Sequence, residues 1–421
     1  MRRCLLIALL PTALAGQTKV VKAAHLLDVR SGRWISDAAV LIREDRIERV
    51  GSAREIEVPP GAQVIDLGSR YLLPGLIDAH IHVNDEPRLR GADYHTASTG
   101  RLTIIGVKSA KITLEAGFTS ARSLGSAHFS DVAVRDGINL GEIPGPRLQV
   151  SGPMVGGTGT HCDYTFLAPE FRYSDEGVAD GVPGILGKVR EGFKYGGDLV
   201  KFCASGGVSG RGNPPDDVHL SQEEMNAIVA EAHRRKRGAT AHAHGSDAIK
   251  MAVRAGVESI EHGSLLDDEA IGLMKERGTA LVATIYGTDW IEAHGAANNF
   301  TPGSIARAKF LEPLAKASFR KAVAAGVRIV FGSDAGTIPH GIQGGQFAQM
   351  VAGGMTPLDA IRSATLWAAE LMGWSDRVGA VEGGKYADLI AVEGDPLTRI
   401  DTLAKVMFVM KGGEVVRSPT K

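Results

Sequence analysis

The sequence is poor in cysteine, has no excess of either charge sign and contains no long apolar run, and each shortage excludes a class of protein. Cysteine occurs three times in 421 residues, at Cys4, Cys162 and Cys203, which is too few for a disulfide framework. Lys and Arg number 47 against 48 Asp and Glu, whereas proteins that bind nucleic acids or anionic membranes carry a basic excess. We therefore expect neither partner, and the sequence leaves open whether Cys162 and Cys203 pair.

The first residues, MRRCLLIALLPTALAG, place two arginines before a short apolar run that ends in Ala13-Leu14-Ala15. This order is typical of a secretory signal peptide with a small-x-small cleavage site. The run is short and is interrupted by Pro11, so it predicts no stable membrane span. We expect residues 1–15 to be removed and the mildly acidic mature protein to be exported, to the periplasm or the medium. A cytoplasmic protein with an apolar start is the alternative.

Residues 18–72 contain short segments in which apolar and polar residues alternate between Gly, Asp and Pro, a pattern typical of strands and turns. Similar segments, YADLIAVEGD and KVMFVMKGGEVV, return near the other end of the chain. We interpret residues 18–72 and 376–417 as two halves of one small β-sandwich domain that both termini build.

Residues 73–375 have a different rhythm, in which short apolar runs are separated by helix-like segments. Ser221 to Gly238 is such a segment, with Ser221 as a cap and Glu224 three residues later. The apolar runs are LLPGLIDAHIH, TSARSL, RLQVSG, DLVKFCAS, ATAHAHG, SIEHGS, ALVATIY and RIVFGSD. Eight strands alternating with helices predict an α/β fold, a (β/α)8 TIM barrel, with catalytic groups at the carboxyl ends of the strands. A doubly wound open sheet is the alternative.

Four histidines, a lysine and an aspartate lie in or at the ends of these predicted strands. The chain has 13 histidines, and each of the six residues alone could be an ordinary polar side chain. In a barrel all six would converge at one mouth, and imidazoles and carboxylates are ligands of Zn²⁺. The residues are His80 and His82 on the first strand, Lys201 on the fourth, His242 on the fifth, His262 on the sixth and Asp334 at the end of the eighth.

This order of ligands, with a β domain split between the termini, resembles the amidohydrolase superfamily of metal-dependent hydrolases over nearly the whole mature chain. The segments LPGLIDAHIH, KFCASGG, AHAHG, IEHG and GSDAG are similar to the branch that contains Xaa-Pro dipeptidases, related carboxypeptidase-like enzymes and ochratoxin-degrading amidohydrolases. The resemblance implies a homo-oligomer, for which we consider an octamer.

The resemblance also implies a site with two divalent ions, for which zinc is the expected metal. His80, His82 and Asp334 would hold one ion, and His242 and His262 the other. A free ammonium has no lone pair for a metal, so the resemblance implies that CO₂ converts Lys201 to a carbamate that bridges both ions. Two such ions can share a water and lower its pKa towards neutrality, forming a metal-bridged hydroxide. Asp334 would act as the general base.

Four weaker candidates for substrate binding surround this set: His161 in GGTGTHCD, His244 on the fifth strand, His340 in DAGTIPHG and Arg211 in SGRGNPPD. The long Gly- and Pro-rich stretch at residues 152–184 predicts a loop that covers the mouth.

We expect hydrolysis of a small amide whose leaving group is an amino acid with a free carboxylate, as in an Xaa-Pro dipeptide, an N-acyl amino acid or ochratoxin. A hydrolase of cyclic amides or lactones on the same metal centre is the main alternative. A mononuclear deaminase would not need Lys201, and a non-enzymatic assembly protein of the same fold would be expected to lack some of the six ligands.

Overall fold

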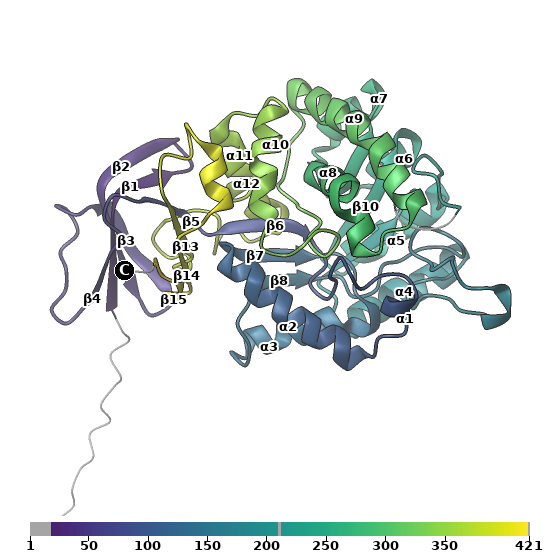
Figure 1. The fold of residues 1–421 in the computed structure, drawn as a ribbon, viewed down its shortest axis with the longest axis horizontal. Coiled ribbons are helices and arrows are strands. Elements are labelled where there is room, and N and C mark those ends of the chain that lie inside the picture. Colours follow the sequence, from purple (N-terminus) through teal and green to yellow (C-terminus); the bar gives the residue numbers. More distant parts are fainter. Residues whose placement is uncertain (1–17, 209–211, 420–421) are drawn as a thin grey trace, which may run out of the picture.

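The structure, a computed structural model, describes residues 18–208 and 212–419. The expected signal peptide, residues 1–15, and the candidate Arg211 lie outside these ranges. A sheet built from both ends of the chain lies beside a larger body of parallel strands and helices (Figure 1). Within the two described ranges, no helix has both the length and the apolar character that crossing a bilayer requires.

The terminal sheet has eight strands in the order β15-β14-β13-β5-β1-β2-β3, with β4 paired to β1. It forks at β1, because one edge of β1 pairs with β4 and then with β5, while β2 runs antiparallel along the other edge. Leu26, Val40, Leu389 and Phe408 are among the residues of its buried core. The strands are β1 Thr18–Asp28, β2 Arg33–Arg43, β3 Arg46–Ser52, β4 Gln63–Asp66, β5 Tyr71–Pro74, β13 Leu389–Val392, β14 Phe408–Lys411 and β15 Glu414–Arg417.

Both termini thus contribute to one β structure, but the described residues form a single forked sheet. The two separate, packed sheets of the expected sandwich are not assigned among them.

The remaining strands form two parallel sheets, β12-β11-β10-β9 and β6-β7-β8. A parallel bridge between Val155 and Phe202 connects the segment after β8 to β9. These strands match the first seven apolar runs of the sequence, although β12 ends at Val282 and the residues after it begin a helix. The bounds are β6 Leu76–Ile81, β7 Phe118–Ser123, β8 Arg147–Val150, β9 Leu199–Cys203, β10 Gly238–Gly245, β11 Ser259–Leu265 and β12 Ala280–Val282.

The eighth expected strand, residues 328–334, is not assigned as a strand. Its backbone nevertheless bonds to both sheets, because Val330 N donates to Leu281 O and Asp334 N donates to His80 O, 2.9 and 2.8 Å away. Isolated parallel bridges join Leu281 to Ile329 and Ile81 to Ala335. The segment therefore lies between β12 and β6 and places Asp334 beside His80.

The first apolar run of the sequence is divided between the two parts of the molecule. Residues 71–74 form β5 of the terminal sheet, and residues 76–81 form β6. Gly75 alone separates them, and a Cβ on Gly75 would lie 2.2 Å from Thr119 Oγ1. A side chain at this position would therefore prevent the close approach of β5 and β6 to β7.

Helices cover the parallel strands. In α5 the apolar residues Met225, Ile228, Val229 and Ala232 recur at helical spacing and are buried. Ser221 and Glu224 form the expected capping box. The helices are α1 Ala92–His95, α2 Thr99–Glu115, α3 Ser130–Asn139, α4 Gly181–Lys194, α5 Gln222–Arg234, α6 Ser246–Ala255, α7 Asp268–Arg277, α8 Ile285–His294, α9 Pro302–Ala325, α10 Gln346–Ala352, α11 Pro357–Ser363 and α12 Leu366–Leu371. Short 3-10 turns are η1 Ala127–Phe129, η2 Pro169–Phe171, η3 Gly295–Asn298, η4 Gln343–Gly345 and η5 Ile400–Ala404.

The two cysteines that the sequence left open form a disulfide. Cys162 lies in the loop between β8 and α4, and Cys203 ends β9, with a sequence separation of 41 and 5.8 Å between their Cα atoms. The bond ties the loop to the strand that carries Lys201.

We expect the disulfide to stabilise the fold, because it limits the freedom of the unfolded chain. The test uses protein that begins at Gly16 and so lacks Cys4. In this protein the double substitution Cys162→Ser and Cys203→Ser should lower the free energy of unfolding by about 2–4 kcal/mol. Urea denaturation without reductant measures the change. Two reactive thiols in unreduced, denatured wild-type protein would show instead that the cysteines are free.

Candidate metal centre

His80, on β6, and His82, directly after this strand, present the same ring nitrogen to one point. His80 Nδ1 lies 2.7 Å from Glu261 Oε2, and His82 Nδ1 lies 3.2 Å from Gly125 O. Because each Nδ1–H donates to an oxygen, the lone pair of each ring is on Nε2. Burial lowers the pKa of both histidines, to about 3 for His82. Both rings are therefore neutral at neutral pH, as a metal ligand must be.

Asp334 completes a first cluster with these histidines. Its Oδ1 lies 3.7 Å from His80 Nε2 and 3.4 Å from His82 Nε2. Burial raises the pKa of Asp334 to about 6, while the charge of Lys201 opposes the rise. The residue has a φ of 60°, and His262 in the second cluster has a φ of 74°. Such left-handed conformations are uncommon for residues other than glycine and are concentrated at functional sites.

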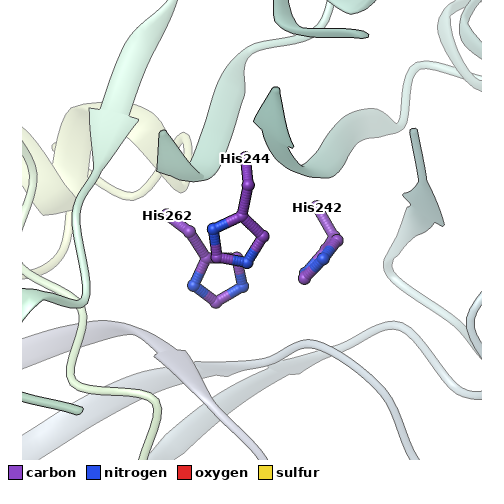
Figure 2. A group of neighbouring side chains, drawn as sticks. All are labelled: His242, His244 and His262. Carbon is purple, nitrogen blue, oxygen red and sulfur yellow. The ribbon is translucent and has the colours of Figure 1, made fainter. Parts of the chain in front are cut away.

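A second cluster consists of His242 and His244 on β10 and His262 on β11. Each offers one nitrogen, and these atoms lie within 4.8 Å of one another. Figure 2 shows the three imidazoles gathered together. The His244 and His262 rings are stacked at 4.8 Å, and His244 Nδ1 is also 2.8 Å from Ser264 Oγ. His244, which was expected in the substrate pocket, thus lies in the same cluster as two expected ligands.

Lys201 lines the same cavity as both clusters and is 1% exposed. Its Nζ has no hydrogen bond or ion pair with any residue that the structure describes. Burial lowers the pKa of Lys201 to about 8, although the charges of Glu261 and Asp334 oppose this. A larger share of its amine is therefore unprotonated and nucleophilic than in an ordinary lysine.

The donor atoms of the first cluster fit a divalent ion. Two atoms that each lie about 2.1 Å from one zinc ion can be at most about 4.2 Å apart, and the His–Asp separations in the first cluster meet this limit. Within the described ranges, His80 Nε2 and Asp334 Oδ1 are buried and have no hydrogen-bond partner. Buried polar atoms are rarely left unpaired, and a shared ion would satisfy both. The His80 and His262 ring centroids are 5.0 Å apart, so the two clusters adjoin.

Glu261 is the residue of this site that sequence reasoning missed. It is fully buried, and its carboxylate accepts hydrogen bonds from Arg122, Thr240 and Ser259 as well as from His80. Arg122 Nη2 lies 2.7 Å from Glu261 Oε1. The available signal was a pair of opposite charges inside the buried strands SIEHGS and TSARSL, because a buried charge needs a partner.

The other expected substrate contacts have different outcomes. The His161 ring stacks on His242 with 4.2 Å between centroids and lines the cavity. His340 lines neither of the two cavities at the site. Its Nε2 is instead 3.2 Å from His82 O and its Nδ1 is 2.9 Å from Thr113 Oγ1, because the chain after Asp334 turns back beneath His82. Arg211 lies outside the described residues.

The candidate metal ligands face a cavity of about 110 Å³. A second cavity of about 460 Å³ adjoins it, and His82, Met154, His161 and Thr337 line both. The predicted mouth loop supplies Met154 and His161, so this loop forms part of the wall of both cavities. The arrangement provides an inner space at the ligands and a larger outer space for the rest of a substrate.

A model of the amidohydrolase family matches residues 71–416, and the chain belongs to this family. It is therefore a hydrolase of a family that generally uses divalent metals, and the two clusters are its candidate metal sites.

Several similar proteins agree with this class. The chain is 34% identical to an ochratoxinase from Aspergillus niger, over 94% of this chain and 86% of that protein. The crystal structure of A. niger ochratoxinase superimposes with a TM-score of 0.83 at 30% identity, covering 96% of both chains. An Xaa-Pro dipeptidase with methionine in its active site gives a TM-score of 0.86 at 33% identity, covering 95% of this chain and 99% of that one. A prolidase complexed with N-methylphosphonate-L-proline gives 0.87 at 32% identity, covering 96% and 100%.

Glu261→Gln keeps the shape of the side chain but removes its charge, so it should weaken metal binding. His80 would lose the carboxylate that orients it, and Arg122 would lose its counter-ion. We expect metal affinity to fall by about 10- to 100-fold, measured by competition with a chelator on protein whose fold is checked by circular dichroism. Glu258→Gln is the matched control, since Glu258 bonds to His233 and the backbone of Ala239 instead. Equal affinities of wild type and Glu261→Gln would refute the orienting role.

Proposed function

We propose that this protein hydrolyses an amide bond to an amino acid with a free carboxylate, such as an Xaa-Pro dipeptide, an N-acyl amino acid or an ochratoxin-like amide. The observation that carries the proposal is the convergence of two ligand clusters and Lys201 on one cavity, in a chain similar to both an ochratoxinase and an Xaa-Pro dipeptidase. The full set of ligands disfavours a non-enzymatic assembly protein.

In this proposal His80, His82 and Asp334 hold one divalent ion, and His242 and His262 hold the other, with zinc as the metal. His244 adjoins the second group. Lys201, once carbamylated by CO₂, would be a ligand of both ions. Its burial and lowered pKa support this modification, because CO₂ reacts with the unprotonated amine. When bound, the ions would polarise the scissile carbonyl and activate a water.

Asp334 is the proposed proton carrier. Its carboxylate would take a proton from the attacking water and deliver it to the departing amine nitrogen. Asp334 lies beside the Nε2 atoms of His80 and His82 and lines the inner cavity, which supports the role because a general base must reach the proton that it takes.

The substrate carboxylate needs a cationic or hydrogen-bonding partner. Arg90 is the one lysine or arginine among the described residues that line the outer cavity. Its guanidinium stacks on Phe300 and donates to Pro87 O and Thr337 O, which fixes its orientation. Arg90 and His161 are therefore two candidate anchors.

Three further expectations stand as proposals. The two parallel sheets and residues 328–335 would form one closed (β/α)8 barrel, beside a terminal sheet folded as a sandwich. The chain would be exported after removal of residues 1–15, and it would assemble into a homo-oligomer.

Lys201→Ala tests the bridging role. Without the carbamate we expect most of the activity and part of the bound metal to be lost, since the ions lose a shared ligand. Short carboxylates added to the variant should partly restore both. Lys194→Ala, at an exposed lysine of α4, should change neither. Full activity with two metals per chain in Lys201→Ala would disprove the two-metal arrangement.

The carboxylate is tested with matched substrates, for example Ala-Pro and its methyl ester or amide. A buried donor left without its partner costs about 1–3 kcal/mol, so blocking the carboxylate should lower kcat/KM on the order of ten- to a hundredfold. Steady-state kinetics on metal-analysed protein measure the ratio. If both forms react equally well, or if only cyclic amides or lactones turn over, the ring-opening alternative replaces this proposal.

A further inference from the structure

Helix α8 forms one wall of the inner cavity, directly after β12. Ile285, Gly287, Thr288 and Ile291 of this helix line the cavity, together with Ala315 of α9. Apolar groups and one hydroxyl thus face the metal ligands from this side, and no charged side chain of α8 lines the cavity.

Gly287 is buried, yet a Cβ added to it would meet no atom within 4 Å. A buried position with open space ahead of it must face a cavity, and Gly287 lines the inner one. Its φ is not in the left-handed region, so the backbone does not require glycine here. Glycine is also a poor helix former compared with alanine.

Gly106 in α2 shows the contrast. It is also a buried helical glycine, but a Cβ there would lie 2.5 Å from Asn84 Nδ2 and 2.6 Å from Val134 Cγ2. Close packing explains Gly106, whereas nothing in the packing explains Gly287. The absence of a side chain at Gly287 enlarges the inner cavity beside the metal ligands.

We propose that Gly287 is a specificity-determining residue, which leaves room next to the metal centre for an uncharged, apolar side chain of one half of the substrate. This inference rests on the proposed amide hydrolysis. The other half of the substrate occupies the larger outer cavity. A methyl group at position 287 would extend into the inner cavity and leave the outer cavity unchanged.

The experiment compares wild type with Gly287→Ala and Gly287→Val on two series of dipeptides. One series varies the residue before proline (Gly, Ala, Val, Leu, Phe), and the other varies the residue after alanine (Ala, Val, Leu, Phe). In the Gly287 variants, one series should change: kcat/KM for the substrate with the largest side chain should fall about tenfold or more relative to that for the smallest. One methylene changes discrimination in an apolar pocket by this order. The other series should keep its wild-type profile.

Gly272→Ala is the matched control, because Gly272 is a helical glycine of α7 whose added Cβ would also meet nothing within 4 Å, but it lines neither cavity at the site. It should leave both profiles unchanged. The Tm of Gly287→Ala should equal or exceed that of wild type, because alanine favours the helix, so a loss of activity cannot be ascribed to unfolding.

The outcomes separate the two claims. Active wild type with unchanged selectivity in both Gly287 variants overturns the inference alone, as does an equal loss for every substrate of both series. A wild type that hydrolyses no dipeptide and no N-acyl amino acid overturns the proposed function, and the inference falls with it.

Discussion

The buried ion pair of Glu261 and Arg122 connects the two halves of the metal centre. Glu261 lies on β11 in one parallel sheet, while Arg122 on β7 and His80 on β6 belong to the other. A carboxylate in this position would be costly without compensation, and here it has four hydrogen-bonding neighbours. Because one ligand cluster comes mainly from each sheet, this interaction fixes their relative position.

Much of the site could be predicted because parallel strands bring their carboxyl ends together. His80, Lys201, His242 and His262 could be located by strand position alone, since the apolar runs that contain them are clear in the sequence. Alternation along a strand placed His80 and His82 on one side, the expected barrel brought the strand ends together, and the resemblance to the amidohydrolase superfamily supplied the expected ligand roles. The capping box of α5 was equally predictable, because its signal lies within four residues.

Other features depend on contacts between distant segments and could not be read locally. The residues that end in Asp334 look like a strand, but their backbone makes isolated bridges instead of a regular ladder. His340 follows Asp334 closely in sequence, yet a turn of the chain directs it under the backbone of His82. The pairing of Cys162 with Cys203 depends on how the mouth loop folds back onto β9. Glu261 was not predicted as a site residue, because the expected role of its neighbour His262 already accounted for the IEHG motif.

The junction at Gly75 has a mechanical consequence. The terminal sheet and the first metal cluster are successive parts of one extended backbone, and β13 from the far end of the chain is paired along β5 just before that junction. A tilt of the sheet would therefore displace the backbone of His80 and His82, because no flexible linker separates β5 from β6. Strands from both ends of the chain therefore hold the backbone that leads to His80 and His82, so removing β1 or β13 would alter the position of these histidines as well as the stability of the fold.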